Sequence, residues 1–264
     1  MNRIVISRKW AALALAPLLF SAGAILRADD ALPKADTILD RYIEVTGGAA
    51  AYKKHKTEIR TGTMEFAAQG LKGSITIYSA EPDKSYAVTE IEGIGKFEQG
   101  TVDGVAWEKN ALTGARVKSG TEKAQAMREG TFNGVLNWRK MYTKAETVGV
   151  ETINGEPCYK VVMTPNEGKP ETGYYSRKTG LELKAEVVVD SPQGELTAEV
   201  FSSEYKTFDG VLTPSKIVQQ AAGQEFVITV QSVKMNEEIP PGRFDLPADV
   251  KALVGKPATK PVDK

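Results

Sequence analysis

Residues 181–190 read LELKAEVVVD, and residues 195–201 read ELTAEVF. Apolar side chains alternate with charged or polar ones in both runs, which is the pattern of strands with one apolar and one polar face. The residues between the runs include Pro192 and Gly194 and predict a turn. The alternation extends over Thr172 to Met235 and predicts four or five consecutive strands. Such strands predict an antiparallel sheet whose apolar face must be covered by another element.

The preceding part of the chain carries the same signals. Asp103-Gly104 and Asn154-Gly155 predict tight hairpin turns, because these residue pairs tolerate the left-handed backbone of such turns. Further strands are predicted over Thr57–Phe66, Leu71–Ala80, Ser85–Ile91, Lys96–Val102, Val105–Lys109, Val148–Ile153 and Pro157–Thr164. We expect about ten or eleven strands in the whole chain.

Two segments have helical spacing instead. Leu32 to Thr46 predicts an amphipathic helix that ends at Gly47-Gly48. Thr121 to Tyr142 predicts a second helical segment with an apolar face, interrupted by Gly130 and Gly134. Glycine inside a helix costs about 1 kcal/mol, so we expect this second segment to be bent or mobile.

Helix, strands, helix and strands follow one another without a change in composition. This order predicts an α+β fold with a single domain over residues 29–250. Residues 251–264 are polar and contain two prolines, so we expect a disordered tail.

The first 28 residues predict a cleavable secretory signal peptide. They combine a basic start with an apolar run, and small residues offer cleavage after Ala24 or Ala28. No cysteine lies near either site, so we expect a soluble periplasmic protein without an N-terminal lipid. The other residues comprise 30 basic and 34 acidic ones, a net charge of −4, which does not favour nucleic acid as a partner.

Little in the sequence indicates catalysis. The chain has one cysteine, Cys158, and one histidine, His55, too few for an ordinary zinc site. We expect Cys158 to lie half-buried in a strand, and His55, flanked by lysines, to be a solvated loop residue. Nucleophile-elbow, phosphate-loop, dinucleotide and zinc-protease motifs are missing. We therefore expect a protein without catalytic residues, metal or cofactor, although paired carboxylates remain open because their pairing is spatial.

The apolar residues suggest a different kind of site. A curved sheet has a concave apolar face, and a hinged helical segment that lies over it without filling it leaves an apolar cavity. The alternative is that each residue belongs to an ordinary core. The candidates for lining such a cavity are Ile75, Ile77, Met127, Phe132, Leu136, Trp138 and Met141.

Several marks, taken in order, resemble the periplasmic lipoprotein-carrier superfamily, which includes the outer-membrane lipoprotein-sorting proteins. They are the helix ending at Thr46-Gly47-Gly48, the turn Thr179-Gly180-Leu181, the stretch Tyr205–Pro214 and the closing segment Ile239–Pro247. The resemblance implies a highly curved antiparallel sheet, an incomplete β-barrel, with helices covering its concave face and a cavity for acyl chains.

The resemblance also suggests a function. It implies a non-enzymatic, monomeric periplasmic protein that binds or carries a lipid or lipoprotein acyl chain, with envelope proteins as possible partners. The alternative is an interaction or stress-sensor module of the same fold with a filled cavity. Relatives of one fold serve different functions, so the fold alone does not decide between them.

Overall fold

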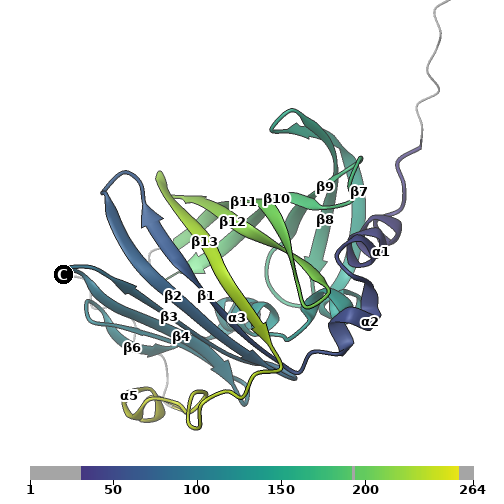
Figure 1. The fold of residues 1–264 in the computed structure, drawn as a ribbon. Coiled ribbons are helices and arrows are strands. Elements are labelled where there is room, and N and C mark those ends of the chain that lie inside the picture. The colour runs from purple at the N-terminus through teal and green to yellow at the C-terminus, as the bar shows by residue number, and fades with distance from the viewer. Residues whose placement is uncertain (1–30, 192–193, 256–264) are drawn as a thin grey trace, which may run out of the picture. The chain divides into compact units, whose positions relative to one another are not determined.

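A single antiparallel sheet dominates the computed structural model, which describes residues 31–191 and 194–255 (Figure 1). Its thirteen strands are β1 Thr57–Phe66, β2 Leu71–Ala80, β3 Lys84–Ile91, β4 Gly95–Val102, β5 Val105–Asn110, β6 Gly114–Val117, β7 Tyr142–Ile153, β8 Glu156–Pro165, β9 Glu171–Ser176, β10 Glu182–Ser191, β11 Gly194–Phe208, β12 Val211–Ala221 and β13 Gln224–Met235. The helical segments are α1 Ala35–Val45, α2 Gly48–Lys53, α3 Gly120–Glu129, the 3-10 turn Gly134–Asn137, α4 Trp138–Met141 and α5 Ala248–Lys251.

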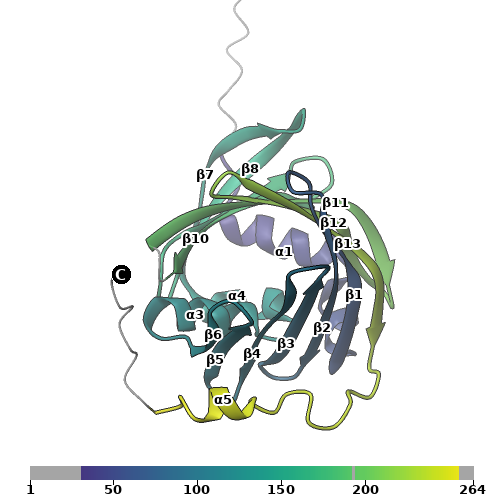
Figure 2. The same cartoon turned by 90° about the vertical axis from the view of Figure 1, so that its left-hand side faces the viewer.

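The strand order explains where the helices lie. Strands that follow one another in sequence pair with each other, except that β1 pairs with β13 and β6 does not pair with β7. Strands β6 and β7 therefore form the two opposite edges of the sheet. The chain between them, with α3 and α4, has to cross from one edge to the other. Figure 2 shows α1, α3 and α4 on the inner side of the curved sheet.

The predicted fold class is confirmed: the sheet is curved and open, and helices lie over its concave face. In α1, Ile38 and Leu39 pack with Trp138, Val161 and Tyr175 in one buried cluster. This packing follows from the helical spacing of the apolar residues of α1, since a helix buries the stripe that faces the sheet.

The outer face of β3 to β6 is covered by the C-terminal segment. Tyr86, Trp107 and Val250 form a buried cluster, and Phe244 and Leu246 pack against it. The neighbouring residues of β2, Ile75 and Ile77, belong to the opposite face because side chains alternate along a strand. This half of the sheet therefore has apolar side chains on both faces.

Two of the sequence marks meet in space. The Leu212 amide donates a hydrogen bond to the Thr46 carbonyl at 2.9 Å. Gly47 has a φ of 129°, and a Cβ there would lie 2.4 Å from the Gly210 carbonyl oxygen. Only glycine fits this contact, which fixes the junction of α1 and α2 on the β11–β12 turn.

The structure differs from the prediction at three places. The sheet has thirteen strands rather than ten or eleven, and β6 was not predicted. The second helical segment ends at Met141, and β7 begins at Tyr142 rather than Val148. The reason is that most of β7 is an exposed or half-exposed edge strand, which lacks the apolar alternation of a half-buried strand.

The domain boundaries stay predictions. Helix α5 ends at Lys251, which is the first residue of the predicted tail. The predicted signal peptide and the Pro192-Gln193 turn lie outside the described residues.

Candidate functional site

Two hollows on the concave face are the candidate sites. The larger one, called the apolar groove here, has a volume of about 680 Å³ and lies over β1 to β5, β12 and β13. Ligand sites usually enclose about 300–1,000 Å³, so the groove has the size of a ligand site. Six of its apolar lining residues are Phe66, Ile75, Ile77, Phe97, Phe226 and Ile228.

Strand register brings these residues together from distant parts of the sequence. Phe66 lies opposite Phe226 where β1 pairs with β13, and their ring centres are 5.4 Å apart. At the rim, Leu112 is 73% exposed and Ile94 is 36% exposed. An apolar hollow with exposed apolar residues at its rim is a surface on which a hydrophobic molecule can displace water.

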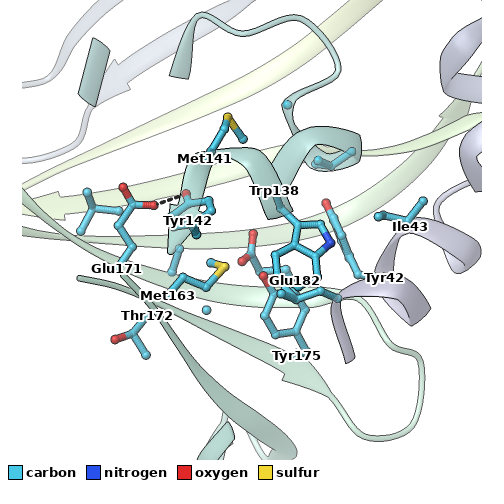
Figure 3. A pocket seen from close by; sticks show the side chains of 16 residues that line it. Tyr42, Ile43, Trp138, Met141, Tyr142, Met163, Glu171, Thr172, Tyr175 and Glu182 are labelled. Atoms are coloured by element: carbon cyan, nitrogen blue, oxygen red, sulfur yellow. Dashed lines mark hydrogen bonds between the residues drawn. The ribbon is translucent and has the colours of Figure 1, made fainter. Parts of the chain in front are cut away.

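The smaller hollow, called the aromatic cavity here, has a volume of about 250 Å³ (Figure 3). It lies between α1, α4 and strands β8 to β10. Its walls combine aromatic rings, two methionines and two carboxyl groups, from Tyr42, Trp138, Met141, Tyr142, Met163, Glu171, Tyr175 and Glu182.

The two carboxyl groups of this cavity have different surroundings. Glu171 forms an ion pair with Arg128 of α3 and accepts a 2.6 Å hydrogen bond from the Tyr142 hydroxyl. Glu182 has no ion-pair partner among the described residues. Burial raises the pKa of Glu182 from 4.5 to about 7; the hydrogen bond from Tyr175 opposes this shift, and the charge of Glu171 adds to it. Glu182 is therefore a carboxyl group that exchanges its proton near neutral pH.

The residues predicted to line one cavity divide between several places. Ile75 and Ile77 line the apolar groove, and Trp138 and Met141 line the aromatic cavity. Met127 borders a separate depression beside α3, which Met141 shares. Phe132 is buried at 9% exposure, and Leu136 is half-buried and belongs to neither hollow.

Sequence reasoning missed Glu182, for a physical reason. In a regular strand Glu182 would face away from Ala185 and Val187, because it is an odd number of residues from both. The pairing of β10 with β9 has an irregularity between Glu182 and Lys184, so one extra residue reverses the alternation. As a result, Glu182 lines the aromatic cavity together with Ala185 and Val187.

The expectation for His55 was wrong. Its side chain is buried, at 1% exposure, and its Nε2 lies 3.0 Å from a carboxylate oxygen of Asp209. The lysines around it suggested solvent, but the ring is buried and faces Asp209 of the β11–β12 turn. Cys158 is fully buried in β8, and burial raises the pKa of its thiol, which disfavours a reactive thiolate.

The described residues contain no cluster of three or more histidine, cysteine or acidic side chains that could hold a metal ion. No helix among the described residues is long and apolar enough to cross a membrane.

Comparison with known proteins supports the fold. No family model matches the sequence, and no curated protein matches it significantly. Among solved structures, a DUF1329 family protein from Desulfovibrio piger has a TM-score of 0.55 at 16% identity, covering 80% of this chain and 97% of that protein. A LolA superfamily protein from Nitrosomonas europaea has a TM-score of 0.55 at 13% identity, covering 81% of this chain and 98% of that one.

These likenesses extend over nearly the whole length of both relatives. The chain therefore has a lipoprotein-carrier-like fold, as its sequence marks predicted. At identities this low the likeness defines the fold and leaves the function open.

Proposed function

We propose that this protein is a periplasmic binding or carrier protein that holds an acyl chain of a lipid or lipoprotein in the apolar groove, without catalysing a reaction. The observation that carries the proposal is the groove itself, about 680 Å³ of mostly apolar space on the concave face. An exported protein of this fold would be suited to carry such a ligand between membranes.

The energetics of acyl binding need no covalent chemistry. Burial contributes about 0.8 kcal/mol per CH₂, so ten buried methylenes supply about 8 kcal/mol before the entropy lost on association is subtracted. The proposal gives Ile75 and Ile77 the role of contacting the chain from the floor of the groove. In this proposal Trp138 and Met141 belong to the aromatic cavity and not to the floor of the groove.

The test combines native mass spectrometry of the protein exported to a bacterial periplasm with lipid extraction of the same sample. We expect a stoichiometric acylated adduct. In Ile75→Asn an amide replaces an apolar contact, which should weaken acyl binding by about 2 kcal/mol, roughly 30-fold. The control is Ser74→Asn, the adjacent exposed residue on the opposite face of β2. A bare protein, or equal binding by both variants, would contradict the proposal.

A second candidate is an envelope-protein interaction module. The observation that favours it lies on edge strand β7, where Val148 is 51% and Val150 42% exposed. Exposed apolar residues on an unpaired edge suit the addition of a strand from another protein. Lysine at both positions should abolish capture of such a partner and leave acyl binding unchanged; loss of acyl binding in this variant would contradict the assignment.

A further inference from the structure

The aromatic cavity contains a carboxyl group without a cation. Of its two acidic residues, Glu171 is neutralised by Arg128, whereas Glu182 has no basic partner among the described residues. Glu182 is half-buried and lines the cavity. A buried carboxylate without a counter-ion is unfavourable, so a bound cation at this position would be stabilising.

The walls around Glu182 suit one kind of cation. Figure 3 shows the Glu182 carboxyl group among the rings of Tyr42, Trp138 and Tyr175. The Tyr42 and Tyr175 rings meet edge to face, with centres 5.7 Å apart. Aromatic faces attract organic cations, and a cage of such rings is a common site for quaternary ammonium groups. A metal ion would need several charged or carbonyl ligands, and the described residues form no cluster of three or more acidic, histidine or cysteine side chains here.

We propose that the aromatic cavity binds an ammonium group, with Glu182 as its counter-ion and the rings of Tyr42, Trp138 and Tyr175 as its walls. The volume of about 250 Å³ limits the occupant to a small amine or to the amine head of a larger molecule. This site is separate from the apolar groove and is independent of the ligand bound there.

Ammonium binding requires Glu182 to be ionised, which makes it dependent on pH. The other titratable groups facing the cavity or Glu182 are the tyrosines Tyr42, Tyr142, Tyr175 and Tyr205 and the Glu171–Arg128 pair. Burial raises the pKa of each of these tyrosines above its ordinary value, so they stay neutral near pH 7. The Arg139 guanidinium lies 4.2 Å from the centre of the Trp138 ring and is paired with Asp36 and Asp40.

The test is calorimetric titration of the intact protein with choline and with dimethylbutanol, the uncharged carbon isostere of choline. Near pH 8 we expect choline to bind at least tenfold more tightly than the isostere. Near pH 6 its affinity should fall about tenfold as Glu182 takes up its proton. Equal binding of the two compounds, or choline binding that does not change with pH, would overturn the proposal.

Variants assign the effect to Glu182. Glu182→Gln should weaken choline binding at least tenfold and remove its pH dependence. Glu186→Gln removes a carboxylate from the same strand, where Glu186 pairs with Lys184 outside the cavity, and should bind choline like the wild type. Unchanged choline binding in Glu182→Gln would also overturn the proposal, and the pH comparison in the wild type keeps the test valid if this variant does not fold.

Two sources of the ammonium group are distinguished by a second titration. Free ethanolamine and vesicles of phosphatidylethanolamine are compared, with phosphatidylglycerol vesicles as control. Binding of free ethanolamine assigns a small amine, whereas binding confined to phosphatidylethanolamine vesicles assigns a lipid head group; binding of neither overturns the inference for primary amines. Ile75→Asn should retain ammonium binding, so failure of the groove proposal and failure of this one give different results.

Discussion

Replacing Glu182 by glutamine should change how the stability of the protein depends on pH. The pKa of Glu182 is about 7 in the folded protein, against 4.5 for an exposed glutamate, because the carboxyl group is buried. The folded protein therefore binds the proton more tightly than the unfolded chain does. Stability contributed by this group is present below about pH 4.5 and is lost as the pH rises through 7.

The size of this loss follows from the shift. Each unit of pKa difference corresponds to about 1.4 kcal/mol, so the full loss is roughly 3 kcal/mol, of which 2 to 3 kcal/mol falls between pH 5 and pH 8. Glutamine resembles the protonated acid in shape and carries no charge. Glu182→Gln should therefore match the wild type near pH 5 and exceed it by roughly 2 kcal/mol or more near pH 8.

The assay is urea unfolding followed by tryptophan fluorescence at several pH values. Glu186→Gln is the control. Burial pushes the pKa of Glu186 up, but bonds from Lys184 and Tyr174 leave it below its ordinary value. Relative to the wild type, that variant should become less stable as the pH rises through the range below about 4.5 where Glu186 ionises, with a constant difference at higher pH, which is the opposite sign. Parallel curves for the wild type and Glu182→Gln, with a constant difference at every pH, would refute the assignment of a raised pKa to Glu182.

Three further results are expected. Arg128→Met should lower the free energy of unfolding by about 3 kcal/mol, because Arg128 neutralises the Glu171 carboxylate, which is only 15% exposed. Adding Glu171→Gln should restore part of this loss, and a coupling energy below about 0.5 kcal/mol in the double-mutant cycle would contradict the pairing. Cys158 should react with a thiol reagent at least 100-fold faster in urea than in the native protein, and rapid native labelling would show that β8 opens. His55→Ala should lower stability by about 2 kcal/mol or more and Asp209→Asn by less than 1, since His55 is buried and the Asp209 side chain is 69% exposed; equal losses would place the energy in the hydrogen bond between the two side chains.

Alternation of apolar and charged residues was sufficient to predict the sheet. The stretch of residues 181–201 forms β10 and the first half of β11, which pair as the alternation requires. The two edge strands were predicted least well. Strand β6 is only four residues long, and β7 is exposed or half-exposed over most of its length with few large apolar residues in its first half, so neither has a clear apolar alternation.

The arrangement of the candidate site could not be predicted. Sequence reasoning selected seven apolar residues for one cavity, of which two line the apolar groove, two line the aromatic cavity and three line neither hollow. Register caused this separation: the pairing of β1 with β13 brings Phe226 next to Phe66, which no local pattern in either strand indicates. The position of Glu182 in the cavity could not be predicted for a similar reason, since a single irregularity in β10 decides which face of the sheet its side chain lies on.

Strand order then limits how either hollow can be reached. Because β6 and β7 are the two edges of one sheet, the chain between them must cross the concave side. Helix α3 is fixed at both ends by charge, through Glu122 to Arg116 of β6 and through Arg128 to Glu171 of β9. Glu171 also lines the aromatic cavity, so an event that weakens its pairing with Arg128 would loosen α3 and change the charge of that cavity together. The Arg128–Glu171 pair thus both holds α3 against β9 and sets part of the charge of the aromatic cavity.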